Sequence, residues 1–445
     1  MPNEASSGTV FPANRFSIAS GNRSIPMKSG KSKHNMPGGS NHSKVNNPHS
    51  NPTSPRDSKE RLDYEPLQDP ESHDTENTPP SGTVLKGRGS SSNPTVRFEK
   101  ISLEILGESS PAIDDLATDP AQNTTASSKG PSTEFFDDSS QSIVTENNSP
   151  DISYRWSINP YRGCEHGCTY CYARPYHEFL GLSAGLDFEQ KIIVKRDASK
   201  LLRDWISRPK WKGERLALSG ITDPYQPIEA KLKITRQILQ LLVQTHHCVT
   251  MITKNALVAR DIDLLSELAT QNLTGIALSI TTLDSELARS MEPRTSSPEA
   301  RLRTVKQLSE AGIPVHVNLA PIIPGLTEHE IPQLVQAAAD HGATSVGMQL
   351  VRLPGAVTEV FSAWLENKFP DRQAKIISRI RAMRDGKLNE AQFGLRMKGS
   401  GPLAESIQQT FRLWAKRCHL DGGMPKLNES LFKPPADTNG QLRLF

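Results

Sequence analysis

From Tyr154 to about residue 355, short apolar, β-branched runs alternate with longer stretches of helical period. This alternation is typical of βα units, in which helices connect parallel strands. Six such strands fit a partial or full barrel of βα units, or a doubly wound open sheet, and either fold puts its chemistry at the C-terminal ends of the strands. The predicted strands are 155–160, 215–220, 248–253, 275–281, 314–322 and 344–351, and the predicted helices are 235–244, 259–270, 297–312 and 328–342.

The first 150 residues have a different character. They contain 27 Ser, 16 Pro and 13 Asn but no Trp and no Cys, so they offer little apolar surface to offset the entropy of ordering. We predict that 1–150 is a largely disordered extension that the chemistry does not need. A short island at 84–106 has alternating apolar residues, and it either docks on the folded part or stays a tail segment.

The rest of the chain divides into two parts. Residues 151–355 contain the βα pattern and form the predicted core. Two further helices, around 371–384 and 403–418, indicate a C-terminal helical extension over 356–445.

Charge is divided near the same boundary. Residues 1–150 have 14 Lys and Arg against 19 Asp and Glu, a net charge of −5, whereas the remainder has 38 against 30, a net charge of +8. A mildly basic folded part permits an anionic partner such as nucleic acid but does not require one. We find no run of about 18 apolar residues and no signal-peptide core, so we expect a cytoplasmic protein without a membrane span.

The most specific motif places Cys164, Cys168 and Cys171 in a C-x3-C-x2-C pattern after the first predicted strand. Three thiolates from one loop can hold a [4Fe–4S] cube and leave one iron open to an outside ligand. A zinc knuckle is the alternative, with His166 as the fourth ligand. The crowding of ligands within this short loop favours the cube.

This spacing, with the aromatic Tyr170 directly before the third cysteine and a βα pattern following, resembles the radical S-adenosylmethionine superfamily. The resemblance implies an α/β fold, a partial (βα)6 TIM-like barrel, with the disordered N-terminal and helical C-terminal extensions added to it. It also implies a [4Fe–4S] cluster, S-adenosylmethionine as cofactor, and an external electron donor of the flavodoxin or ferredoxin type. The implied activity is reductive cleavage of S-adenosylmethionine to a 5′-deoxyadenosyl radical, which abstracts a hydrogen atom from the substrate.

Later segments narrow the branch. The sequences SGITDPYQPIE, TKNA and NLAPIIPGLTE, which follow predicted strands or overlap their ends, are similar to spore photoproduct lyase and to bacterial relatives often labelled DNA repair photolyases. The resemblance spans roughly 155–355. Carried over by position, it implies that the cofactor is bound by Tyr170, Thr222, Asp223, Lys254, Ser279 and Asn318.

One position departs from that branch. The lyase has a hydrogen-donating cysteine directly before the Ser/Thr-Asp pair, and here that residue is Ile221. The departure argues against the lyase reaction itself, and the catalytic residues stay unassigned. Candidate substrates are therefore nucleic acid, or a small molecule or peptide, and a non-catalytic iron–sulfur redox protein is the alternative of another class.

Overall fold

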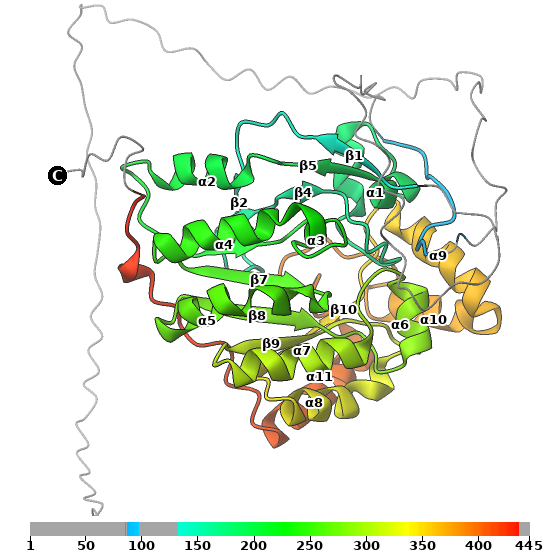
Figure 1. Ribbon diagram of the computed structural model, residues 1–445. Coiled ribbons are helices and arrows are strands. Elements are labelled where there is room, and N and C mark those ends of the chain that lie inside the picture. The colour runs from blue at the N-terminus through cyan, green and yellow to red at the C-terminus, as the bar shows by residue number, and fades with distance from the viewer. Residues whose placement is uncertain (1–84, 86, 98–131, 436–445) are drawn as a thin grey trace, which may run out of the picture. The chain divides into compact units, whose positions relative to one another are not determined.

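Six parallel strands form the centre of the structure, a computed structural model that describes residues 85, 87–97 and 132–435 (Figure 1). Each strand coincides with one of the six predicted from the alternating pattern, to within one or two residues at most ends. Their bounds are β3 (Trp156–Ile158), β6 (Leu216–Leu218), β7 (Val249–Thr253), β8 (Thr274–Ser279), β9 (Val315–Ile322) and β10 (Ser345–Leu350).

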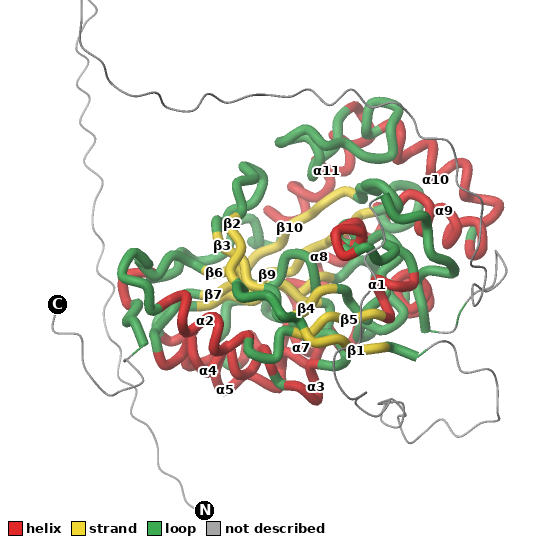
Figure 2. The backbone as a smooth tube through the Cα atoms, turned by 90° about the horizontal axis from the view of Figure 1, so that it is seen from above, coloured by secondary structure: helices red, strands yellow, loops and turns green. Residues whose placement is uncertain are grey.

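The order of these strands decides between the two folds that the sequence left open. They lie side by side in chain order, from β3 through β6, β7, β8 and β9 to β10, and every neighbouring pair is parallel. A doubly wound sheet reverses direction at a switch point, whereas a barrel adds each strand on the same side. The sheet is therefore the predicted partial (βα)6 barrel, and Figure 2 shows its curvature. A short antiparallel strand, β2 (Val144–Glu146), pairs with β3 at the open edge.

Helices cover the outer face of this sheet (Figure 1). The helix predicted at 297–312 begins at Pro298: Ser297 Oγ accepts a hydrogen bond from the Ala300 N–H, and Pro298 occupies the first helical position. Five of the helices were not predicted, namely α1, α2, α3, α6 and α9. The helices are α1 (Leu186–Gln190), α2 (Ala198–Ile206), α3 (Glu229–Leu232), α4 (Ile234–Gln244), α5 (Ile262–Thr270), α6 (Ser285–Met291), α7 (Pro298–Glu310), α8 (Ile331–Asp340), α9 (Val357–Lys368), α10 (Pro370–Ala382) and α11 (Gly401–Arg417), with 3₁₀ turns at Arg174–Tyr176, Glu178–Leu180, Ala256–Asp261, Glu328–Glu330 and Glu429–Leu431.

The main core lies between the sheet and these helices. Leu216, Val249, Ile276 and Val315, one from each of four neighbouring strands, have no exposed surface. Near-continuous apolar strands are what a parallel sheet covered on both faces requires. This packing fixes the strand ends, and so the positions of the residues that follow them.

A second, smaller sheet lies beside the barrel and contains β1 (Glu134–Asp137), β5 (Lys191–Val194) and β4 (Tyr161–Arg162). Strands β1 and β2 precede residue 150, the end of the predicted extension, yet both pair with strands of the core. The folded part as described therefore begins N-terminal to that predicted boundary. Residues 1–84, 86 and 98–131, which include parts of the predicted extension and of the predicted island at 84–106, lie outside the described residues.

The C-terminal part is helical, as expected. Helix α11 packs against α8 and β10, and α9 packs against α10. In the part of the chain that the structure describes, no helix is both long and apolar enough to cross a membrane.

Candidate active site

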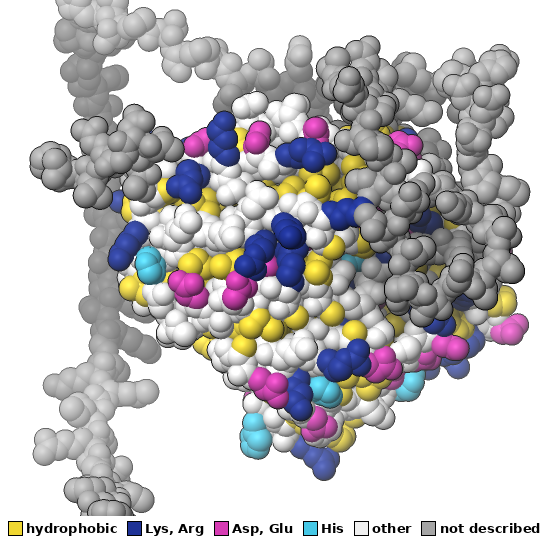
Figure 3. Space-filling view, in the orientation of Figure 1, with side chains coloured by type: hydrophobic (Ala, Val, Ile, Leu, Met, Phe, Trp, Pro, Cys, Tyr) yellow, Lys and Arg dark blue, Asp and Glu magenta, His cyan; other side chains and the backbone are white. Residues whose placement is uncertain are grey.

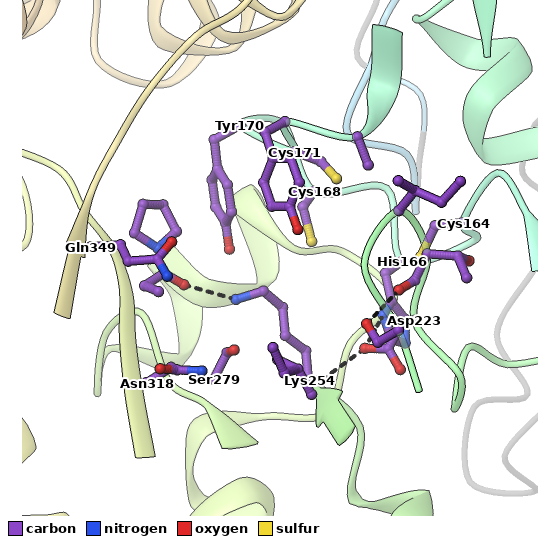
Figure 4. Close-up of a pocket in the computed structure, with 18 of the residues that line it drawn as sticks. Cys164, His166, Cys168, Tyr170, Cys171, Asp223, Lys254, Ser279, Asn318 and Gln349 are labelled. Carbon is purple, nitrogen blue, oxygen red and sulfur yellow. Dashed lines mark hydrogen bonds and ion pairs between the residues drawn. The ribbon is translucent and has the colours of Figure 1, made fainter. Parts of the chain in front are cut away.

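The three motif cysteines line one pocket at the C-terminal ends of the barrel strands (Figure 4). Cys164 and Cys168 are buried, and Cys171 is partly buried. The opposite walls come from the ends of β7, β8, β9 and β10 and from the loop after β6. All six residues that the resemblance implies for cofactor binding also line this pocket: Tyr170, Thr222, Asp223, Lys254, Ser279 and Asn318.

The cysteine loop is fastened to its surroundings by hydrogen bonds. The Cys164 N–H donates to the Phe188 carbonyl over 2.9 Å, and Thr222 Oγ1 donates to the Gly163 carbonyl over 2.7 Å. The Glu165 carboxylate accepts from the Ile228 N–H over 2.7 Å. The loop after β6 therefore holds the cysteine loop in place, and the Thr222 hydroxyl is used in that contact.

His166 does not behave as a metal ligand. Its Nδ1 lies 3.3 Å from Asp223 Oδ2, and its Nε2 lies 3.3 Å from the Asn255 side-chain nitrogen, so both ring nitrogens are engaged. Nor do the described residues contain three His, Cys, Asp or Glu side chains arranged around a single ion. A zinc knuckle needs four ligand atoms within about 2.3 Å of one metal, and the site lacks that geometry.

The cysteines suit a larger sulfur-ligated group instead. In a cube, each of three thiolates binds a different iron, so the sulfur atoms need not converge on one point. Burial raises the pKa of all three thiols. A bound cationic metal centre would compensate the thiolate charge that this apolar setting disfavours, so the residues fit an iron–sulfur cube.

Asp223 is buried and fully hydrogen-bonded. Its Oδ1 accepts from Thr253 Oγ1 and from the Tyr225 N–H, and its Oδ2 accepts from the Lys254 N–H over 2.8 Å. Burial by itself would raise the pKa of Asp223, but His166 and these donors hold the pKa below its ordinary value. The carboxylate therefore links the end of β7 to the cysteine loop.

Lys254 lies at the centre of the pocket in Figure 4. Its Nζ is 3.2 Å from Glu292 Oε1 and donates to the Ala320 carbonyl over 3.1 Å, and it lies 5.5 Å from the Tyr170 ring centroid. The ammonium is thus held between a buried carboxylate and the open pocket. The sequence predicted Lys254 in the pocket but not its partner.

Glu292 anchors a wholly buried network. Its Oε1 accepts from the Tyr170 hydroxyl and, over 2.7 Å, from Thr281 Oγ1, while its Oε2 pairs with the Arg301 guanidinium. Burial opposes ionisation, but Arg301 and Lys254 together with these donors lower the pKa of Glu292. Arg301 also donates to the Ser279 carbonyl over 2.8 Å. The Glu292–Arg301 pair therefore positions Tyr170 and the end of β8, and it does not face a substrate.

Ser279 and Asn318, which the resemblance implies for cofactor binding, lie on the neighbouring strands β8 and β9. Ser279 ends β8, and its hydroxyl has no hydrogen-bond partner among the described residues. The Asn318 side-chain oxygen lies 3.1 Å from His316 Nε2 on β9. Both side chains lie on the wall facing the cysteines (Figure 4), with polar atoms available to a ligand.

The mouth of the pocket has an aromatic and a cationic side chain. Tyr172 is 41% exposed, and its hydroxyl donates to the Gly220 carbonyl over 2.6 Å. The Arg352 guanidinium lies 4.8 Å from the Tyr172 ring centroid, and it has no carboxylate partner among the residues described. Ile221 lines the pocket, whereas Cys248 is buried just before β7, at the far end of that strand.

Sequence reasoning missed a buried pair behind the cysteine loop. Arg174 and Glu189 have no exposed surface, and Arg174 Nη2 lies 2.6 Å from Glu189 Oε1. Arg174 also donates to the Cys168 carbonyl over 3.0 Å. Nothing in the local pattern marks Glu189, because it lies in the short helix α1, outside the cysteine motif.

Known proteins with similar sequences include an uncharacterized protein of Mycobacterium tuberculosis, 35% identical over 238 residues, which are 53% of this chain and 69% of the relative. An uncharacterized protein of Methanocaldococcus jannaschii is 32% identical over 176 residues, 40% of this chain and 63% of the relative. Among solved structures, spore photoproduct lyase complexed with dinucleoside spore photoproduct aligns with a TM-score of 0.48 at 18% identity, over 64% of this chain and 79% of that chain. The family model described as "Radical SAM superfamily" matches residues 158–338, which run from the end of β3 into α8 and include the cysteine loop. This chain therefore belongs to the radical S-adenosylmethionine superfamily.

Proposed function

We propose that Cys164, Cys168 and Cys171 hold a [4Fe–4S] cluster whose fourth iron takes S-adenosylmethionine, and that the enzyme abstracts a hydrogen atom from its substrate. The observation that carries the proposal is the shared pocket: the cysteines face polar side chains from the ends of successive strands. When bound, the cluster supplies the electron that cleaves S-adenosylmethionine into methionine and a 5′-deoxyadenosyl radical. An external flavodoxin- or ferredoxin-type protein would supply that electron to the cluster.

The residues around the cysteines have separable tasks. The Lys254 ammonium is the charge-assisted donor for the carboxylate of the methionyl group. The Ser279 hydroxyl and the Asn318 amide offer hydrogen bonds to the other polar groups of the cofactor. Thr222 and Asp223 act through the backbone, since their side chains fix the cysteine loop and the Lys254 N–H.

Apolar side chains exclude water from the same space. Ile221, Ile252, Pro321 and Leu350 line the pocket between the polar groups. A radical that reacts with hydrogen atoms must be kept from side reactions, so a largely apolar wall suits this chemistry. A purely electron-transferring protein would have no use for polar side chains that converge beside its cluster.

The pocket mouth supports an anionic, ring-containing substrate, and we include nucleic acid in the proposal on that ground. Arg352 stacks on Tyr172 without a carboxylate partner among the described residues, and such a guanidinium suits phosphate recognition. An exposed aromatic ring beside a cation is the usual platform for an unpaired base. On the face shown in Figure 3, Lys and Arg side chains are interspersed with Asp and Glu.

Ile221 argues against the reaction of spore photoproduct lyase. An aliphatic side chain cannot donate a hydrogen atom to a product radical as a thiol does, and Cys248 does not line the pocket. In the proposed reaction, therefore, no cysteine at this position donates a hydrogen atom to the product radical, whereas one does so in the lyase reaction.

The test is anaerobic reconstitution with iron and sulfide, followed by dithionite and S-adenosylmethionine. We expect 5′-deoxyadenosine from the native protein and from Cys418→Ala, and none from Cys168→Ala. A fully iron-loaded protein that yields no 5′-deoxyadenosine would overturn the proposal.

The substrate class has its own test. Single-stranded oligonucleotides should increase the rate of 5′-deoxyadenosine formation, and Arg352→Gln should reduce that increase while Arg412→Gln, on the exposed face of α11, should not. If oligonucleotides do not change the rate, nucleic acid is excluded as the substrate, and a small molecule or a peptide is the candidate that stays.

A further inference from the structure

We propose that residues 87–97, here called the clasp, are part of the cluster site and hold the cysteine loop in its ligating conformation before iron binds. The inference rests on the proposed function, because it concerns the same three cysteines. It goes beyond that function because it gives residues 87–97 a structural role, whereas their composition predicted that they belong to a dispensable extension.

The first observation is a close approach of two backbones. Gly89 lies so near Gly167 that a Cβ atom on Gly89 would overlap the Gly167 carbonyl oxygen. Gly167 itself lies between Cys164 and Cys168 and has a φ of 64°. Because no side chain fits between them, the clasp covers the middle of the metal-binding motif directly.

The second observation is a buried carboxylate that joins the clasp to the motif. Glu189 Oε2 accepts from the Gly89 N–H over 3.0 Å, and Glu189 Oε1 accepts from the Ser90 N–H over 2.9 Å. The same carboxylate pairs with Arg174, whose guanidinium donates to the carbonyls of Cys168 and Gly167 over 3.0 and 3.1 Å. Removing the clasp would leave this buried carboxylate with fewer donors than its burial requires.

The third observation is that the clasp continues across the segment 183–187. The Ser92 carbonyl accepts from the Leu186 N–H over 3.2 Å, and the Pro94 carbonyl accepts from Ser183 Oγ over 2.8 Å. The Asn93 side-chain oxygen accepts from the Asp187 N–H over 3.0 Å. At its end, Arg97 Nε lies 2.6 Å from the buried Glu178 carboxylate.

These contacts make the clasp more than a tail lying on the surface. At one end of the clasp, Gly89 and Ser90 contact Glu189, whose partner Arg174 contacts the cysteine loop. At the other end, Arg97 contacts Glu178, which begins the 3₁₀ turn Glu178–Leu180. A loop that must present three thiolates in one geometry loses affinity when it becomes mobile, because ordering it then costs binding free energy. We infer that the clasp orders the cysteine loop before the metal binds.

The experiment uses the full-length protein without metal and measures the rate at which each cysteine is alkylated. Gly89→Ala introduces one methyl group against a backbone carbonyl, and Gly422→Ala is the matched control, because that glycine has no atom within 4 Å of its Cβ position. We expect Gly89→Ala to raise the alkylation rates of Cys164 and Cys168 about tenfold, since local opening exposes them. The alkylation rate of the remote Cys248 should stay the same in both variants.

A second variant removes contacts without adding bulk. Asn93→Ala with Ser183→Ala deletes hydrogen bonds at the outer part of the clasp, and it should raise the same rates by a smaller factor of about three. After reconstitution, both clasp variants should contain less iron and lose it faster to a chelator than Gly422→Ala, with an unchanged urea midpoint for the barrel.

Unchanged alkylation rates and iron retention in both clasp variants would overturn the proposal. A raised rate at Cys248 together with a lowered urea midpoint would also overturn it, because the clasp would then stabilise the whole fold instead of the loop. None of these measurements depends on cleavage of S-adenosylmethionine, so failure of the proposed function would be seen separately.

Discussion

The Lys254 ammonium lies 3.2 Å from the Glu292 carboxylate, and this pair joins the end of β7 to the segment after α6. The contact places a cation at the pocket surface with a buried anion behind it. A free lysine would be mobile at this position, whereas the paired one is held in place.

Replacing Lys254 tests that arrangement. Lys254→Ala should weaken S-adenosylmethionine binding about ten- to a hundredfold, because a hydrogen bond to a charged group contributes about 1.5–3 kcal/mol. Iron content should be unchanged, and Lys254→Arg should restore only part of the affinity, since a planar fork does not replace a compact ammonium. Calorimetric titration of the reconstituted variants measures this. Unchanged affinity would mean that Lys254 serves only as the partner of Glu292.

Glu292 should matter more for folding than for affinity. Glu292→Gln removes the anion between Arg301 and Lys254, and breaking a buried pair from one side costs about 3–5 kcal/mol. The control is Lys306→Ala, which removes an exposed pair with Glu310 and should change the free energy of unfolding by at most about 1 kcal/mol. Urea unfolding of the two variants gives the comparison, and equal effects would show that the buried network is not what stabilises the site.

The cysteine assignment separates the five cysteines into two groups. Replacing Cys164, Cys168 or Cys171 by Ala should abolish the brown chromophore and reduce iron to background after reconstitution. Cys248→Ala and Cys418→Ala should retain both, since neither residue lines the pocket. Zinc bound stoichiometrically in place of iron after anaerobic preparation would contradict the assignment.

The buried side chain of His247 should make the free energy of unfolding depend on pH. Its Nε2 accepts from Trp211 Nε1 over 3.0 Å and its Nδ1 lies 2.9 Å from the Cys248 carbonyl, so the neutral ring is fully bonded. Burial lowers the pKa of His247 to about 4. Because the unfolded chain binds more protons between pH 6.5 and 4, the contribution of His247 is complete above pH 6.5 and is lost as pH falls toward 4, by about 3 kcal/mol.

Urea unfolding across this range checks the sign. His247→Phe should flatten part of the pH dependence, and a remainder should persist because burial also lowers the pKa of His177 to about 4. A variant with the full native slope between pH 6.5 and 4 would exclude His247 as a source of the effect.

The six strands could be predicted from the sequence alone, and so could the residue types that line the proposed site. Apolar runs at the right intervals predicted all six parallel strands, because burial on both faces leaves a pattern that local residues display. Chain order also placed Thr222, Lys254 and Ser279 at or beyond strand ends, where parallel strands bring their C-termini together, and it placed Asn318 within β9. The C-x3-C-x2-C spacing predicted the proposed cluster ligands for the same local reason.

Which of these side chains form contacts inside the protein depends on how separate elements of the fold pack together. Asp223 and Lys254 both line the pocket, yet Asp223 already accepts from Thr253 and from backbone donors and lies beside His166, and Lys254 is paired with Glu292. The contact between Gly89 and Gly167 joins positions far apart in the chain. Such pairings depend on distances between separate elements, and a composition that looked too polar to fold alone can still dock where a buried carboxylate offers hydrogen bonds.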